Sequence, residues 1–491
     1  PTRVLEIIEN ENSKELDVVK LIDTKDEVGV YAALSYCWGT SGHLMMTREN
    51  MQELKSTGVP FARLPKTMQD AVALSQRLDI NKLWIDALCI CQDDKEDWAH
   101  EAGEMTSVYS NAFVIIAACT AEDSKRGCFS NRVQGESVEI AFKSRRGKHG
   151  LLHILEYDLE ECDPYEKLVM SCEPLSLRAW TLQERTLARR IVHLSSDQAY
   201  FECTEGTSAE DGSSYGFRHM NIYDEVPNDS FDGMPHHDVW YRIVENYSNR
   251  RLSVATDKFP ALSGLARIFK SRTKANYVAG LWSNDLVHGL TWEPITTSPT
   301  GANTDLALMG DNSDYIAPSW SWASYNGAVG FPPNRGNSLV YVQDYGTSSV
   351  STNPLGQIDD AWITLQGLLF PVKYCNQYHK NSLFHYGGHV LCADLSGNDA
   401  SHLPATLECQ ALDPILFQQL SRECSLFALP ISTIPATQHM RSDSRTVCYA
   451  LIVGRSLFDP EMKLKRLAIV PLRAEDGLFH DFRHKHIVTL Y

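Results

Sequence analysis

Apolar residues between positions 30 and 120 occur in two alternating patterns, which predict strands and helices in turn. Three near-continuous apolar runs read as strands: residues 31–39 (YAALSYCWG), 82–90 (KLWIDALCI) and 113–119 (FVIIAAC). Two segments between them, 64–80 and 96–112, place their apolar residues at helical spacing. Strands that are apolar on both faces and alternate with helices are typical of a parallel α/β sheet. We therefore predict that the three strands are parallel neighbours.

The remaining pattern divides the chain into three regions. Residues 1–205 are predicted to form the α/β domain, with a polar insertion and a hairpin or two at about 122–172. Residues 206–310 begin with a Gly-, Ser- and Asp-rich stretch, which predicts a long loop, and continue as a helical pair. Residues 311–491 carry mainly strand signals, including 319–326 (SWSWASYN), where alternating Trp320 and Trp322 are expected in the core.

Charge and hydropathy exclude several partner classes. The net charge is −17, whereas nucleic-acid binding and docking on anionic lipid need a basic surface. The longest apolar run, AFVIIAACTA, is the length of a buried strand and too short to span a bilayer. We expect neither a nucleic-acid nor a membrane partner. The chain begins at Pro1, and whether a targeting segment precedes this residue is left open.

The thirteen cysteines predict buried thiols rather than a metal site. Most lie singly in apolar runs, and the Cys89-x-Cys91 pair, on a predicted strand end, has no second pair to complete a zinc site. The histidine groups His379/His385/His389 and His480/His484/His486 have irregular spacing and are expected at the surface. We predict no metal, at most an incidental disulfide, and a reducing, cytoplasmic location.

Five segments of the first 205 residues form a recognisable series: ALSYCWG, LPKTMQDAVALSQRL, LWIDALCICQDDKEDWAHEAGEMTSVYSNA, GCF and RAWTLQERTLARRIVHL. In this order and at this spacing, they resemble the fungal heterokaryon-incompatibility (HET) domain. RRLSVATDKFPALSGLA and APSWSWAS resemble segments that often follow this domain in longer members. The resemblance implies a cytoplasmic fungal protein of nonself recognition and programmed cell death, with self-association or a protein partner in signalling.

The HET domain is in turn similar to the Toll/interleukin-1 receptor (TIR) domain, which has a flavodoxin-like parallel sheet. In TIR domains that cleave NAD, a W-C-x-x-E segment supplies the catalytic glutamate. WTLQE places Trp180 and Glu184 at this spacing, with Thr181 in the cysteine position. The resemblance therefore implies that Glu184 is catalytic and that NAD is a substrate, with no resident cofactor.

The same resemblance implies the binding residues. Ser35, Trp38, Gly39 and Asp86 would lie at the carboxyl ends of two strands, where open α/β sheets bind ligands. Arg178 or Arg185 would bind the diphosphate with its forked guanidinium, and Trp38 or Trp180 would offer an aromatic face for stacking. We expect Ser35, Trp38, Asp86 and Glu184 to converge. A carboxylate near the ribose would stabilise the positive charge that develops as nicotinamide leaves.

Each of these residues also has a structural interpretation. Glu184 lies among four arginines and could pair with Arg178 or Arg185. Asp86 could cap a helix or loop, and Trp38-Gly39 could be a tight turn. Two other function classes also stay open: a nonenzymatic signalling module that self-associates, and an enzyme on a specialised small molecule bound between the two halves. A hydrolase built on Cys37 is disfavoured because no base is marked near it.

Overall fold

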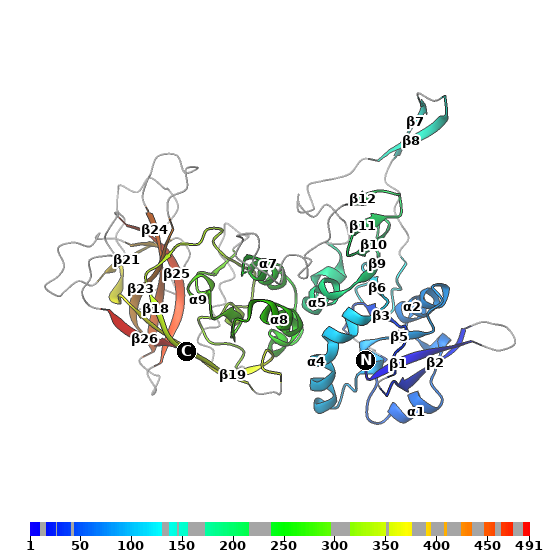
Figure 1. Cartoon of the computed structure of the whole chain (residues 1–491), viewed down its shortest axis with the longest axis horizontal. Helices are drawn as coiled ribbons and strands as arrows, with labels where there is room; N and C mark the ends of the chain where they lie inside the picture. Colours follow the sequence, from blue (N-terminus) through cyan, green and yellow to red (C-terminus); the bar gives the residue numbers. More distant parts are fainter. Residues whose placement is uncertain are drawn as a thin grey trace. The chain divides into compact units, whose positions relative to one another are not determined.

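The computed structural model divides the chain into two compact units. The first comprises Pro1–Glu225 with Arg250–Leu252, and the second comprises Val226–Asn249 with Ser253–Tyr491 (Figure 1). The residues that the structure describes are 1–9, 16–25, 27–40, 44–129, 137–144, 147–155, 172–215, 237–295, 315–349, 353–375, 389–393, 407–409, 424–434, 446–456, 463–474 and 485–491. Within these residues, no helix is both long and apolar enough to cross a bilayer.

The first unit is built on one large sheet. Its strand order is β12-β11-β10-β9-β6-β3-β5-β1-β2-β4. The strands are β1 (Arg3–Glu9), β2 (Leu16–Asp23), β3 (Ala32–Ser35), β4 (Val59–Pro60), β5 (Lys82–Trp84), β6 (Val114–Ala118), β9 (Arg190–Leu194), β10 (Ala199–Cys203), β11 (Gly206–Ala209) and β12 (Ser214–Tyr215). Strand β3 pairs in parallel with both β5 and β6, and β6 pairs in parallel with β9. The predicted parallel neighbours are thus confirmed.

Antiparallel strands extend this parallel core at both sides. The β1–β2 hairpin, which the apolar pattern did not reveal, joins the sheet beside β5. On the other side, β10 pairs antiparallel with β9. Gly206–Tyr215, within the expected loop, forms β11 and β12. The sheet is therefore mixed, with its parallel strands in the middle.

Helices cover both faces of the parallel strands. They are α1 (Met51–Ser56), α2 (Lys66–Arg77), α3 (Asp86–Cys89), α4 (Lys95–Asn111) and α5 (Ala179–Leu187), with short 3-10 turns at Phe61–Arg63 and Pro174–Leu177. In Figure 1, α2 lies on one side of β3 and β5, and α4 with α5 lies on the other. The Asp94 side chain caps α4 by accepting hydrogen bonds from two backbone N–H groups of the first turn. The expected helices at 64–80 and 96–112 are present.

The second expected strand, within the apolar run 82–90, is present but covers only the first part of that run. Strand β5 ends at Trp84, and α3 begins at Asp86. The Asp86 Oδ1 atom accepts from the backbone N–H of Ala87 at 2.7 Å, and Cys89 N donates to Ile85 O at 2.8 Å. Because a short aspartate side chain can bond the adjacent backbone, it favours a turn over a continued strand. Cys89 consequently lies in a helix, not on a strand end.

Part of the insertion at 122–172 forms a two-stranded hairpin. Strand β7 (Ser137–Lys143) pairs antiparallel with β8 (His149–Leu155). Residues 130–136, 145–146 and 156–171 of the expected insertion lie outside the described part of the chain. The insertion thus contains at least one of the expected hairpins.

The second unit begins with an aromatic, helical core. Its helices are α7 (His237–Ser248), α8 (Pro260–Thr273) and α9 (Leu286–Gly289), with 3-10 turns η4 (Ala255–Asp257) and η5 (Trp322–Ser324). The expected helical pair is α7 and α8. Trp320 and Trp322 are buried, as expected for core residues, but the predicted strand at 319–326 is wrong. Their indole N–H groups donate to Leu490 O and Gly280 O, and such hydrogen bonds hold a buried irregular segment in place.

The second sheet agrees with the strand signals beyond residue 310. Its order is β18-β19-β26-β25-β24-β23-β20-β21-β22, with β17 against β23, and its pairs are antiparallel except β25 with β26. These strands are β17 (Asn337–Ser338), β18 (Tyr341–Ser349), β19 (Ile358–Gly367), β20 (Phe370–Cys375), β21 (His389–Ala393), β22 (Leu407–Cys409), β23 (Cys424–Ile434), β24 (Thr446–Ser456), β25 (Leu464–Ala474) and β26 (His486–Leu490). Two-residue strands form the small pairs β13 (Tyr277–Val278) with β14 (Leu281–Trp282), and β15 (Glu293–Pro294) with β16 (Val329–Gly330).

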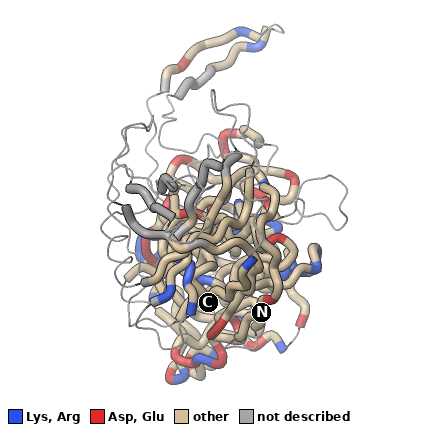
Figure 2. The backbone as a smooth tube through the Cα atoms, turned by 90° about the vertical axis from the view of Figure 1, so that its left-hand side faces the viewer, with Lys and Arg blue, Asp and Glu red and all other residues tan. Residues whose placement is uncertain are grey.

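The charged side chains and thiols of the described residues form no cluster that could bind a metal ion. Acidic and basic residues are interspersed along the backbone (Figure 2). Cysteines 37, 89, 91, 119, 128, 203 and 448 carry free thiols, and the described chain holds no group of three His, Cys, Asp or Glu residues suited to a metal ion. His379, His385, His480 and His484 lie outside the described residues. The expected absence of a metal stays a prediction.

Candidate functional site

The parallel strands bring four predicted residues to one edge of the first sheet. Strands β3 and β5 end at Ser35 and Trp84, so Ser35 and the adjoining Asp86 follow their carboxyl ends. Trp38 follows β3, and Glu184 comes from helix α5, which is distant from β3 in the sequence. Hydrogen bonds pair Ser35 with Glu184 and Trp38 with Asp86, and the negative charge of Asp86 acts on Glu184. This edge is where open α/β sheets bind ligands.

Glu184 is buried and bonded to Ser35. The Ser35 hydroxyl donates to Glu184 Oε2, and the exposed fraction of Glu184 is only 4%. Burial raises the pKa of Glu184 to about 7, because desolvation penalises the charged form. The positive charge of Arg178 and hydrogen bonds from Ser35 and Tyr109 oppose this rise, and the negative charge of Asp86 adds to it. Desolvation therefore outweighs the nearby arginine.

Asp86 is the second carboxyl group of the site. Its Oδ2 atom accepts from Trp38 Nε1 at 2.8 Å, so the indole of Trp38 is oriented by this hydrogen bond. Burial raises the pKa of Asp86, against the charge of Arg178 and hydrogen bonds from Trp38, Ala87 and Tyr36. Two carboxyl groups with raised pKa values next to one guanidinium cannot both ionise without cost.

Arg178 is the cation between these carboxyl groups. Its Nη1 atom donates to the backbone O of Tyr36 at the end of β3. Burial lowers the pKa of Arg178, but the negative charges of Glu184 and Asp86 raise it above its usual value. The guanidinium is thus held against the strand by one hydrogen bond and shared electrostatically by both carboxylates.

The other arginine adjacent to Glu184 has a different partner. Arg185 Nε lies 2.9 Å from Glu202 Oε2 on β10, and His193 Nε2 lies 2.9 Å from the same oxygen. Arg185, Glu202 and His193 are all buried. This network anchors α5 to β9 and β10, so Glu184 is not the counter-ion of Arg185.

Gly39 and Trp180 occupy less specific positions. Gly39 has φ +90°, and a Cβ there would lie 2.5 Å from Asp123 Cβ, so a tight turn requires glycine. Trp180 is half-buried, packs against the apolar core of the unit and lies one turn before Glu184 on α5. The structure therefore gives Gly39 a definite backbone role and Trp180 a packing role.

Two tyrosines complete the site, and sequence reasoning missed both. The Tyr36 side chain forms a hydrogen bond with Asp86, and the Tyr109 side chain of α4 forms one with Glu184. The Tyr109 hydroxyl also lies 3.4 Å from Leu34 O. Burial raises the pKa of each tyrosine well above its usual value, so both hydroxyls remain protonated donors. Tyr109 lies in the segment 96–112, whose apolar residues have helical spacing, and this spacing carries no signal of the contact that its hydroxyl group makes.

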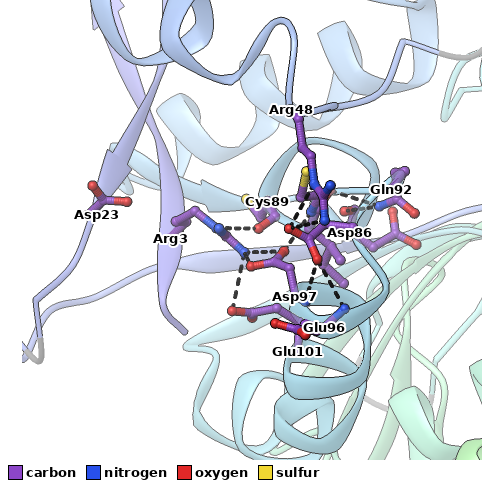
Figure 3. Close-up of polar contacts among 12 residues, drawn as sticks. Arg3, Asp23, Arg48, Asp86, Cys89, Gln92, Glu96, Asp97 and Glu101 are labelled. Carbon is purple, nitrogen blue, oxygen red and sulfur yellow. Dashed lines mark hydrogen bonds and ion pairs between the residues drawn. The ribbon is translucent and has the colours of Figure 1, made fainter.

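A separate ion-pair network fixes helix α3, which begins at Asp86 (Figure 3). Arg3 Nε donates to Cys89 O at 2.8 Å, and Arg3 Nη2 lies 2.6 Å from Asp97 and 3.3 Å from Glu101. Asp97 also accepts from Cys91 N at 2.8 Å. The N-terminal strand β1 thus holds the end of α3 against α4, and this keeps Asp86 at the edge of the sheet.

Residues 31–184 match the model of a known family, described as Heterokaryon incompatibility protein (HET). The chain carries a HET domain. The matched range includes the seven predicted site residues, from Ser35 in β3 to Glu184 at its last position. No curated protein and no solved structure matches the chain. The matched range therefore includes the parallel strands β3, β5 and β6 and both residues of the Ser35–Glu184 contact, whereas β9 follows it.

Proposed function

We propose that this HET-domain protein acts in fungal heterokaryon incompatibility and programmed cell death by cleaving NAD at the nicotinamide–ribose bond. The domain spans residues 1–205 in this proposal, works in the cytoplasm and has a TIR-like, flavodoxin-like fold. The order of the parallel strands supports this fold: β5-β3-β6-β9 is 2-1-3-4 in chain order, as in flavodoxin-like sheets. The helical and mostly β regions that follow, 206–310 and 311–491, would serve self-association or a protein partner.

The observation that carries the proposal is the Ser35–Glu184 contact at the carboxyl end of β3. A carboxylate that accepts a hydroxyl hydrogen bond can accept one from a ribose hydroxyl in the same way. In a dry site, this carboxylate would stabilise the positive charge on the ribose as the bond to nicotinamide breaks. Trp38 or Trp180 would stack on a ring of the nucleotide, and Arg178 would bind its diphosphate. Nicotinamide leaves from a cation and needs no acid.

The pH dependence of NAD cleavage tests this role. Because the charged form of Glu184 is required and its pKa is about 7, nicotinamide release should rise as pH increases through 7. At pH values well below the pKa, the rate should fall about tenfold per pH unit, as the carboxylate fraction does. Initial rates of nicotinamide release from NAD, at high protein concentration, would measure this profile. A rate that is independent of pH, or higher in acid, would contradict it.

A second candidate is a nonenzymatic signalling module. The specific observation in its favour is the burial of Glu184, whose carboxyl group is already bonded to Ser35 and Tyr109. In this case the carboxyl group would stabilise the domain, and the domain would signal by self-association. NAD binding measured by calorimetry without nicotinamide release would favour this candidate over the hydrolase.

A further inference from the structure

A three-residue segment from the second half of the chain belongs to the first unit. Helix α7 ends at Ser248, and Arg250–Leu252 then joins the first unit before the chain returns to the second unit at Ser253. These residues lie outside the family match, which ends at Glu184. The rest of residues 226–491 belongs to the second unit.

The segment bonds both sides of Arg178. Arg251 N donates to Leu177 O at 2.6 Å, and Ala179 N donates to Arg251 O at 2.9 Å, which makes a parallel bridge between Arg178 and Arg251. The Arg250 side chain also donates from Nη1, to Arg178 O at 3.3 Å and to Thr181 Oγ1 at 3.1 Å. The backbone from Leu177 to Thr181 is thus held by two residues distant in sequence.

These bonds satisfy a helix end that lacks an ordinary cap. The first N–H groups of a helix have no partner within it, and a side chain at the N-cap usually supplies one. Arg178 is the N-cap of α5 and makes no side-chain cap hydrogen bond. The carbonyl of Arg251 accepts from Ala179, the first residue of α5, and so replaces the missing cap.

We propose that Arg250–Leu252 is a positioning segment through which the second unit controls the Glu184 site. It fixes the start of α5, which carries Arg178 at its N-cap and Glu184 further along the same helix. Because residues on both sides of the segment belong to the second unit, a rearrangement there would alter the bridge and shift Arg178. The consequence for NAD cleavage rests on the proposed function, whereas the effect on α5 does not.

Amide hydrogen exchange in the full-length protein tests the segment directly. Arg251→Pro removes the N–H that donates to Leu177, whereas Arg251→Ala removes only an exposed side chain and keeps the backbone bridge. In the proline variant, a peptide covering 178–187 should exchange roughly tenfold faster, as expected for the loss of one or two backbone hydrogen bonds. The alanine variant should match the wild type. Unchanged exchange in a folded proline variant would overturn the proposal.

The titration of Glu184 gives a second readout, which a purely structural role would leave unchanged. If the segment positions Arg178, then Arg250→Gln should weaken the attraction between Arg178 and Glu184 and raise the pKa of Glu184 further. The pKa can be followed by carboxyl ¹³C NMR, with the signal assigned by its loss in Glu184→Gln. If Arg251→Pro does not fold, Arg250→Gln takes its place as the test variant. A pKa equal to that of the wild type would contradict the proposal.

The two readouts separate this inference from the proposed function. If faster exchange of α5 and a higher pKa of Glu184 occur in a protein that never releases nicotinamide, the positioning segment stands and the hydrolase fails. If the wild type releases nicotinamide and neither variant changes exchange, pKa or rate, the hydrolase stands and the positioning segment fails.

Discussion

Glu202→Ala is expected to lower the free energy of unfolding by about 3–5 kcal/mol, because it leaves a buried guanidinium without its carboxylate. Glu202 Oε2 lies 2.9 Å from Arg185 Nε and 2.9 Å from His193 Nε2, and the Glu202 side chain is fully buried. Removal of the carboxylate therefore takes away an acceptor that lies within hydrogen-bond distance of both nitrogen atoms. Urea unfolding of the full-length protein would measure the loss.

A surface glutamate near Glu202 provides the matched control. Glu205 is exposed in the turn between β10 and β11, so Glu205→Ala should change the free energy of unfolding by less than about 0.5 kcal/mol. The double variant Glu202→Leu with Arg185→Met replaces the buried pair by apolar groups and should recover much of the loss. Equal stability of Glu202→Ala and the wild type would mean that the pair does not anchor α5.

The parallel sheet was predictable because local apolar runs determine it. A strand that is apolar on both faces must be covered on both faces, and helices between such strands supply the cover. The runs ending near Ser35 and Cys119 meet this condition, and β3 and β6 are parallel neighbours. The parallel pairing of β3 and β5 also places Ser35 and Asp86 near the same edge of the sheet.

Elements whose form depends on single hydrogen bonds were not predictable in this way. The run at 82–90 is apolar enough for one strand, yet the Asp86 side chain bonds the next N–H and starts a helix. The Trp320–Trp322 segment alternates like a strand, but its indole N–H groups bond distant carbonyls and stabilise an irregular turn. In both cases burial was predicted correctly and backbone conformation was not.

The partners of the arginines could not be read from the sequence at all. Arg178 precedes Glu184 by almost two helical turns and Arg185 follows it directly, yet Arg178 donates to the backbone of Tyr36 and Arg185 pairs with Glu202. These choices depend on how α5 is rotated against β3 and β10. That rotation is set by contacts distant in sequence, including the bridge from Arg251.

Glu184→Gln is expected to reduce nicotinamide release from NAD by about 100- to 1000-fold, which corresponds to about 2.7–4 kcal/mol of transition-state stabilisation. Glutamine keeps the size of the side chain and can still accept from Ser35, but it cannot carry negative charge. The matched control is Glu205→Gln, which makes the same chemical change at an exposed position and should leave the rate unchanged.

The pH dependence of folding stability shows whether this loss of rate comes from a missing catalytic charge or from a destabilised fold. Desolvation raises the pKa of Glu184 from 4.5 in its ordinary environment to about 7, so the folded protein binds more protons than the unfolded chain between these pH values. Stability from this group is therefore highest at acidic pH and falls as pH rises through that interval. Glutamine is never charged, so Glu184→Gln should remove this decline and cost about 1 kcal/mol or less at neutral pH. Melting temperatures of both proteins between about pH 5 and pH 8 would measure it. A variant that loses about 3–5 kcal/mol at every pH, from a wild type that releases no nicotinamide, would mean that Glu184 serves as the buried counter-ion of Arg178.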